Sequence, residues 1–167
     1  YIRELYLKYD YQEVITPQIF DIELFKTSGH YKNYKENMYF TKPDEREFGL
    51  KPMNCPSHCL LFGSEKHSYR ELPLRMADFG RLHRYEKSGS LHGLSRVRTF
   101  CQDDAHIFCS LDQLKSEIFK FIEMLNTIYQ TLGMPNYKLF LATRPDNRMG
   151  TEEYWDQSEK ALADAIT

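Results

Sequence analysis

Apolar residues in two segments of the chain recur at the three- to four-residue spacing of α-helices. Four of them share one face of a helix predicted over residues 1–10: Ile2, Leu5, Tyr6 and Tyr9. A longer apolar stripe predicts a second helix over residues 114–132. Ser110 followed by Gln113 is the sequence signature of a capping box at the start of this helix. Gly133 and Pro135 are expected to end it.

Shorter helices are predicted where a capping residue or a proline precedes an apolar segment. Asp21 can cap a short helix that Ser28 and the following glycine end. Pro56 suits the first turn of a helix running to about Lys66. A last helix is predicted from about Thr151 to the end of the chain.

The segments between these helices predict strands. They comprise residues 12–16, 38–41, 48–53 and 137–143, and a long hairpin of residues 74–86 and 96–109. A polar turn joins residues 38–41 to 48–53, and a loop of about nine residues closes the long hairpin. We therefore expect an α+β fold in which an antiparallel sheet is flanked by helices.

The second strand of the long hairpin carries an unusual set of side chains. Side chains alternate between the two faces of a strand. One face therefore presents two guanidinium groups, a ring, an amide, a carboxylate and an imidazole: Arg96, Arg98, Phe100, Gln102, Asp104 and His106. Such a face does not suit a core, and it calls for a polyanion, a planar ring and a metal ion. The opposite face is mostly small or apolar and can pack against helices.

Composition places the chain among globular proteins. Its 167 residues are 41% hydrophobic and 14% aromatic, which is enough for one domain with a proper core. No apolar run approaches the ~18 residues of a membrane span, and no signal peptide opens the chain. We therefore expect a cytoplasmic protein with no membrane partner. Its four cysteines should then be reduced, so metal ligation is a sharper expectation than disulfide formation.

The charge balance limits what this segment binds. The formal net charge is −2, whereas a domain that binds nucleic acid broadly usually has a basic surplus. Because Tyr1 lies inside the first predicted helix with no initiator methionine, we expect a piece of a longer protein.

Several ordered motifs resemble one enzyme family. Arg84 and Glu86, a loop, and then Arg96 and Phe100 resemble motif 2 of the class II aminoacyl-tRNA synthetases. The fuller text is similar to the bacterial type of threonyl-tRNA synthetases over six segments: residues 27–30, 36–40, 51–58, 71–80, 89–98 and 102–109. The resemblance runs from the first residue to the last.

The resemblance implies that residues 1–167 are the N-terminal part of a class II catalytic domain. The helix of residues 1–10, the strand of residues 12–16 and Pro17 would form motif 1, which usually builds the dimer interface. Taken alone, this is simply a helix–strand unit that a proline ends. Motif 3 and an anticodon-binding domain have no counterpart in this chain, and we expect the longer parent protein to carry them.

The resemblance assigns ATP binding and catalysis to the hairpin. Arg84 matches the catalytic arginine that holds both the substrate carboxylate and the α-phosphate of ATP, for which a planar forked donor is suited. Glu86 would lie near the adenine amino group and Phe100 would stack on adenine. Arg96 would reach the terminal phosphates, which carry Mg²⁺. Taken alone, Arg84 and Glu86 could be a surface pair and Phe100 a core ring.

Cys55 and His106 match two zinc ligands of the family. A catalytic zinc has three protein ligands and one open position, and the family's third ligand is a histidine beyond residue 167. Cys55 precedes the helix predicted at Pro56, where a helix N-terminus favours the thiolate. A lone cysteine there is more often a small buried hydrophobe, and a lone strand histidine is more often structural.

The implied zinc would select the substrate. A hydrophobic pocket separates threonine from valine only ~10²-fold, whereas a Lewis acid can take both the amino nitrogen and the hydroxyl oxygen of threonine. Met53 matches a pocket residue beside the zinc. Gln102 is the candidate for the amino group of the substrate, and Asp104 for its hydroxyl group. Taken alone, Met53 would be a core residue and Asp104 a solvated carboxylate.

The expected function is ATP-dependent activation of threonine and its transfer to the acceptor end of tRNA(Thr), by a longer parent protein that forms a homodimer through motif 1. Two other classes remain open. One is a synthetase-like module that binds threonine or ATP without charging tRNA. The other is a dimerisation fragment without catalysis.

Overall fold

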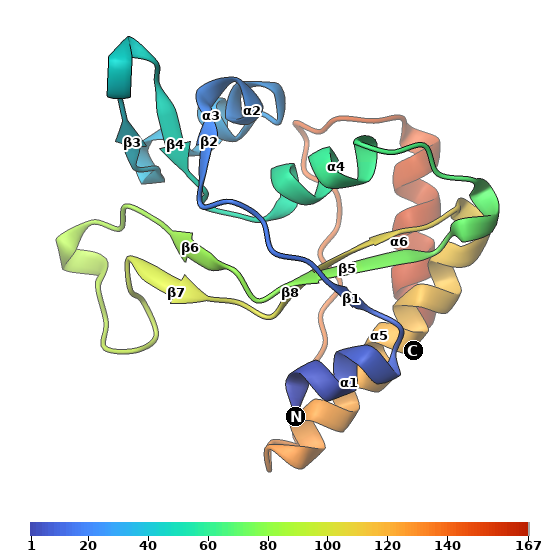
Figure 1. Ribbon diagram of the computed structural model, residues 1–167. Helices are drawn as coiled ribbons and strands as arrows, with labels where there is room; N and C mark the ends of the chain where they lie inside the picture. The colour runs from blue at the N-terminus through green and yellow to red at the C-terminus, as the bar shows by residue number, and fades with distance from the viewer. Residues whose placement is uncertain (167) are drawn as a thin grey trace.

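The computed structural model describes residues 1–166, in which helices pack around small sheets (Figure 1). The α-helices are α1 (Ile2–Lys8), α2 (Ile22–Thr27), α3 (His30–Tyr34), α4 (Cys55–Gly63), α5 (Leu111–Thr131) and α6 (Glu152–Ile166). The strands are β1 (Gln12–Glu13), β2 (Ile19–Asp21), β3 (Phe40–Thr41), β4 (Phe48–Leu50), β5 (Leu74–Asp78), β6 (Arg81–His83), β7 (Thr99–Cys101) and β8 (Asp104–Phe108). Short 3-10 helices span Lys35–Asn37, Pro43–Glu45, Tyr69–Glu71 and Ser88–Ser90.

The predicted long hairpin is present but interrupted. β5 pairs antiparallel with β8, and β6 pairs antiparallel with β7. Both pairs belong to one register, because Asp78 lies opposite Asp104 and Arg81 lies opposite Cys101. The ladder opens only at residues 79–80 and 102–103. The second strand begins at Thr99 rather than at Arg96, because the chain leaves the ladder for the loop after one further hydrogen bond, from Arg84 N to Arg98 O at 2.9 Å.

Two further sets of strands complete the fold. β1 lies parallel to β5, so it extends the β5–β8 sheet on its other edge. β2, β4 and β3 form a separate antiparallel sheet, in which β2 was not predicted. The chain therefore has the expected α+β class, with antiparallel pairing dominant and β1–β5 as the parallel exception. No helix within residues 1–166 combines the length and the apolar character that crossing a membrane requires.

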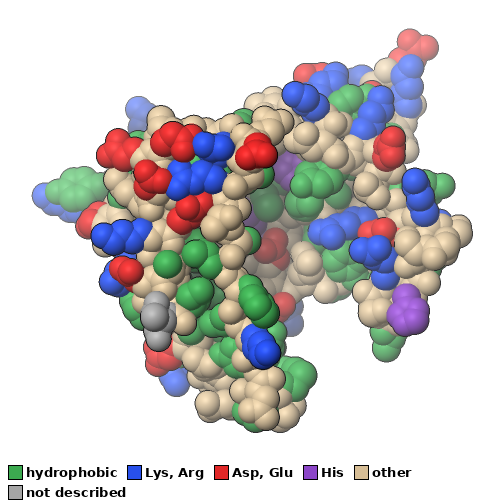
Figure 2. All heavy atoms as spheres, turned by 180° about the vertical axis from the view of Figure 1, so that it is seen from behind, with side chains coloured by type: hydrophobic (Ala, Val, Ile, Leu, Met, Phe, Trp, Pro, Cys, Tyr) green, Lys and Arg blue, Asp and Glu red, His purple; other side chains and the backbone are tan. Residues whose placement is uncertain are grey.

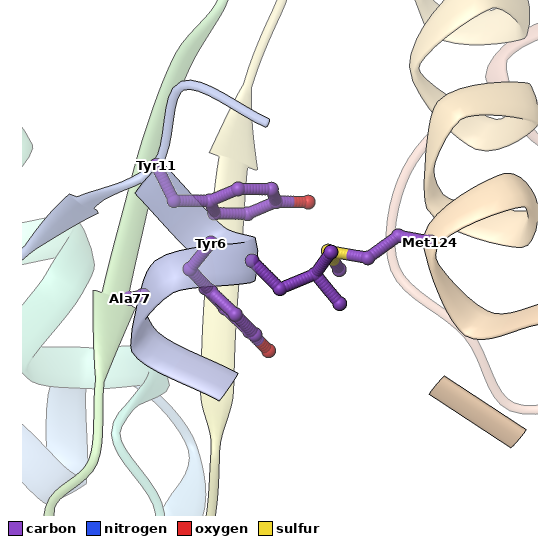
Figure 3. Packing of buried hydrophobic residues seen from close by; sticks show 5 residues of the cluster. Tyr6, Tyr11, Ala77 and Met124 are labelled. Carbon is purple, nitrogen blue, oxygen red and sulfur yellow. The ribbon is translucent and has the colours of Figure 1, made fainter. Parts of the chain in front are cut away.

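The main core holds α1 and α5 against β5. Tyr6, Tyr11, Ala77 and Met124 meet there, and Figure 3 shows Met124 reaching from α5 toward the two tyrosine rings. The rings of Tyr6 and Tyr11 have centroids 4.8 Å apart. A smaller core of Ile22, Phe25 and Met38 lies against the β2–β4–β3 sheet. The central hairpin is therefore fixed on one side by packed helices, as a site built on it requires.

Most helices begin or end close to the predicted residues. Asp21 Oδ1 accepts the Glu23 N–H at 3.0 Å, and Gln113 Oε1 accepts the Ser110 N–H at 3.1 Å. The helix predicted to run to Lys66 ends earlier, at Gly63.

The strand predicted over residues 137–143 is wrong. A strand needs a neighbouring strand to satisfy its main chain, and within residues 1–166 no strand pairs with this segment. It runs instead as an irregular connection from α5 to α6 (Figure 1).

Candidate functional site

The hairpin and its loop enclose a cavity of about 430 Å³. Every residue predicted to bind ATP lines it, and so does the residue predicted for the substrate amino group: Arg84, Glu86, Arg96, Phe100 and Gln102. The molecular surface is hollowed near its middle, with basic, acidic and histidine side chains around the hollow (Figure 2). The fold thus brings together two cations, one carboxylate and one ring. The ring of Phe100 comes from β7, and the other three groups come from the segments that join β6 and β7 to the loop.

Arg84 is held in place by two contacts. Its Nε donates to the main-chain oxygen of Pro52 at 3.1 Å, and its guanidinium carbon lies 5.1 Å from the centroid of the Phe100 ring. Its Nη1 and Nη2 atoms make no hydrogen bond within residues 1–166. The side chain is therefore oriented while its forked end remains available to an anion.

Arg98 has a role that the sequence did not reveal. Its Nε donates to the main-chain oxygen of Glu86 at 3.0 Å, and its Nη2 donates to Ser88 Oγ at 3.3 Å. Its guanidinium carbon lies 5.2 Å from the centroid of the Tyr85 ring. Arg98 therefore braces the start of the hairpin loop.

The first turn of α4 packs against the second strand of the hairpin. Asn54 Nδ2 donates to Asp104 Oδ2 at 3.1 Å. His58 Nδ1 lies 2.7 Å from His106 Nδ1, with the two ring planes at 89°. Arg84 also bonds to this region through Pro52. Three of the hairpin side chains with predicted roles, Arg84, Asp104 and His106, therefore contact residues 52–58. Met53 lies partly buried in the same segment.

Cys55 begins α4 and is half-buried. Burial is the main cause that raises the pKa of its thiol, and the negative charge of Asp104 adds to the effect, while Arg84 opposes it. The main chain at the start of the helix lowers the pKa of the thiol, as expected, but burial and Asp104 outweigh it. Cys55 also lines a second cavity of about 480 Å³, together with His30 and Pro56.

The two residues predicted to hold zinc are suitable ligands, but a catalytic zinc site needs three protein ligands. Cys55 and His106 supply a sulfur and an imidazole nitrogen, both of which zinc accepts. The contacts of Asn54 and His58 bring the turn that carries Cys55 against the strand that carries His106. Within residues 1–166, no three His, Cys, Asp or Glu side chains are grouped closely enough to hold a metal ion. A third protein ligand would have to come from elsewhere.

A buried polar cluster behind the site was missed. We call it the Lys51 network, and its members are Thr16, Lys51, Ser57, His58 and Asp78. Asp78 Oδ2 accepts from Thr16 Oγ1 at 2.7 Å and lies 3.3 Å from Lys51 Nζ. Lys51 Nζ donates to Thr16 Oγ1 at 2.8 Å, and Ser57 Oγ donates to the same oxygen at 3.2 Å.

One signal could have revealed this network. Lys51 and Asp78 are charged residues inside two segments that the sequence predicts as strands of the core. A buried charge requires a partner, so the two could have been paired with each other. The network connects the end of β5 to the segment after β1 and to α4.

Comparison with known proteins agrees with these features. Residues 34–163 match the family described as the tRNA synthetase class II core domain (G, H, P, S and T). Threonine–tRNA ligases of Bdellovibrio bacteriovorus and Nitrosomonas eutropha are 74% and 51% identical over 99% of this chain. The chain spans only 25% and 26% of the length of these relatives.

A solved structure resembles the chain over almost its full length. It is the crystal structure of the RNA binding domain of threonyl-tRNA synthetase from Cryptosporidium parvum Iowa II, with a TM-score of 0.93 and 54% identity. The similarity covers 99% of this chain and 41% of that one. The sequence matches and the shared fold lead to one assignment: the chain belongs to the family of class II tRNA synthetase core domains.

Proposed function

We propose that this chain is part of the catalytic domain of a threonine–tRNA ligase, whose parent protein activates threonine with ATP and transfers it to tRNA(Thr). One observation carries the proposal: Arg84, Glu86, Arg96 and Phe100 line a single cavity of about 430 Å³. Two guanidinium groups suit a triphosphate, a ring suits adenine, and a carboxylate suits the adenine amino group.

Arg84 is the proposed catalytic residue. Activation requires an oxygen of the threonine carboxylate to attack the α-phosphorus of ATP in line, with pyrophosphate leaving. Two anions must approach, and negative charge builds on the phosphoryl oxygens. With Nε fixed on Pro52, the remaining nitrogens of Arg84 can contact both the carboxylate and the α-phosphate. Arg96 and Mg²⁺, brought in with ATP, neutralise the terminal phosphates.

Threonine would lie where the hairpin meets α4. Asp104 is held by Asn54 through Oδ2, so Oδ1 can accept the threonine hydroxyl. Gln102 lines the ATP cavity two residues away, where its amide can contact the amino group. Met53 would form the wall of the pocket. Cys55 and His106 would hold zinc with a third donor from the rest of the parent protein. When bound, zinc supplies a Lewis acid for the threonine amino and hydroxyl groups.

A homodimer and a tRNA acceptor end are further parts of the proposal. Ile15 is 90% exposed and lines an apolar opening with Pro17 and Leu60, which supports dimerisation through the motif 1 region. The acceptor end would reach the site from the side of the hairpin loop. We place the parent protein in the cytoplasm, where tRNA is charged.

The test uses the full-length parent protein, purified with its metal content measured. Pyrophosphate exchange is followed with threonine, serine and valine, and charging is followed with tRNA(Thr). We expect about one zinc per chain, exchange with threonine far faster than with valine, and charging of the tRNA. Absence of threonine-dependent exchange would contradict the proposal, and exchange without charging would favour a binding module.

A further inference from the structure

The contact between His58 and His106 has a chemical requirement. Their Nδ1 atoms lie 2.7 Å apart, with ring centroids 4.7 Å apart and planes nearly perpendicular. Two imidazole nitrogens can approach this closely only if one carries a proton and the other presents a lone pair. His106 Nδ1 is occupied in either direction, so the direction of this hydrogen bond decides whether His106 Nε2 carries a proton or a lone pair.

Asp78 sets that direction. His58 is fully buried, and its Nε2 faces Asp78 Oδ2 at 3.7 Å with no hydrogen-bond partner among residues 1–166. The carboxylate of Asp78 is itself fixed by Lys51 and Thr16. An ionised carboxylate can only accept, so the proton of His58 is favoured on Nε2. The Nδ1 atom of His58 then presents its lone pair.

The tautomer of His58 determines the tautomer of His106. If His58 Nδ1 is the acceptor, His106 Nδ1 must be the donor and His106 Nε2 must carry the lone pair. The opposite arrangement would place a lone pair of His58 against the Asp78 carboxylate and a proton on His106 Nε2. A protonated nitrogen cannot ligate a metal, so only the first arrangement leaves His106 competent.

We propose that His58 and Asp78 are positioning residues that select the tautomer of His106 and present its Nε2 to a transition metal of the zinc type. Metal-bound histidines generally donate their other N–H to a neighbouring acceptor, which fixes the ring and raises affinity. In this chain the acceptor is a second histidine, which a buried carboxylate orients from behind. The inference rests on the proposed zinc site and adds the residues behind it.

The experiment measures zinc affinity of the full-length parent protein by competition with a chelating indicator. His58→Leu removes the acceptor and keeps an apolar side chain in the buried position. His58→Asn is the conservative variant, because its amide oxygen can take the place of Nδ1. His67→Phe is the matched control, since His67 is a part-buried histidine that stacks on Phe62 away from the site. Thermal melting of each variant shows whether it is folded.

We expect His58→Leu to weaken zinc binding ~10- to 100-fold, His58→Asn to recover most of the affinity, and His67→Phe to bind as wild type does. Cobalt-substituted protein should report the same order in its visible absorption. A folded His58→Leu variant with wild-type zinc affinity would overturn the inference. If that variant does not fold, His58→Phe replaces it, because phenylalanine keeps a ring in the buried position but offers no acceptor, and unchanged affinity there has the same meaning.

One further variant separates this inference from the proposed zinc site. Cys55→Ser removes a proposed ligand and should abolish tight binding. If Cys55→Ser loses zinc while folded His58→Leu keeps it, only the positioning role fails. If Cys55→Ser keeps zinc, or the wild type binds none, the zinc site itself is wrong and the positioning role falls with it.

Discussion

Arg84 Nε is bonded to the main-chain oxygen of Pro52 at 3.1 Å, which ties the hairpin to the turn that begins α4. The cavity lined by Arg84 and Phe100 and the start of α4 are therefore joined by the side chain that we propose acts on both substrates. Loss of this contact would leave the guanidinium group held by the Phe100 ring alone.

Arg84→Ala in the full-length parent protein is expected to slow threonine-dependent pyrophosphate exchange ~10²–10³-fold, because one charge-assisted contact made in the transition state is lost. Arg81→Ala is the matched control, since Arg81 is an exposed arginine of β6, three residues before Arg84, and does not line the cavity that Arg84 lines. Exchange is measured at saturating substrates. If Arg84→Ala slows exchange only twofold, Arg84 is not a catalytic residue.

Asp104→Ala is expected to raise the Michaelis constant for threonine and to change that for ATP little. A buried hydroxyl without its acceptor costs about 1–3 kcal/mol. Asp103→Ala serves as control, because its side chain is exposed and neighbours Asp104 in sequence. The measurement is pyrophosphate exchange at varied threonine and varied ATP. If ATP affinity alone falls, Asp104 belongs to the nucleotide site.

Gly80→Ala is expected to destabilise the fold by about 1–3 kcal/mol, because overpacking a buried site forces neighbours to move. A Cβ at Gly80 would lie 2.7 Å from Asp78 Oδ1 and 2.8 Å from Lys51 Nζ. Gly89→Ala is the control, since a Cβ there meets nothing within 4 Å. Denaturant unfolding compares the two. Equal free energies of unfolding for both variants would show that Asp78 and Lys51 can move aside without loss of stability.

Glu117→Leu is expected to cost ~3–5 kcal/mol, because it leaves Arg75 buried and unpaired. Arg75 Nε and Nη2 bind the two carboxylate oxygens of Glu117 at 2.5 Å and 2.7 Å, with both residues buried. The double variant Arg75→Met with Glu117→Leu should recover most of the lost stability. A double variant as unstable as the single one would show that the fold needs the ion pair itself.

Acid should weaken the same contact. Burial favours a raised pKa at Glu117, but hydrogen bonds from Arg75 and Lys120 outweigh it and hold the pKa below its ordinary value. The ionised carboxylate therefore adds stability above its unfolded pKa, and this is lost as the pH falls through its folded pKa. Melting from pH 6 down to about pH 3 should show a smaller drop for Glu117→Gln than for wild type. Parallel curves would exclude Glu117 as a source of acid sensitivity.

Local patterns predicted much of the fold. Asp21, Ser110 and Gly133 act at helix ends as expected, because caps depend on a few neighbouring residues. Helix caps are short-range, so one sequence carries enough information to predict them. Hairpin alternation was only partly successful: Arg96, Phe100 and Gln102 line one cavity, but the other three side chains of that predicted face do not.

The long-range features were not predicted. Parallel pairing of β1 with β5 joins segments about 60 residues apart, and nothing local in residues 12–13 indicates it. Residues 137–143 have strand-like composition but no partner strand within residues 1–166. The Lys51 network escaped because its members lie in four separate segments and meet only after folding. The raised pKa of the Cys55 thiol likewise depends on burial and on Asp104, which sequence position alone does not give.

The shared register of the two halves of the hairpin bears on which changes of chain length the protein can accept. The paired residues of β5 with β8 and of β6 with β7 follow one register, so the break at residues 79–80 does not shift the pairing. An added or deleted residue between Thr99 and Phe108 would shift the alternation, and Asp104 and His106 would turn away from α4. Length changes at the tip, within residues 87–95, leave the offset intact. Natural variation and engineered insertions should therefore be tolerated at the tip better than within the strands.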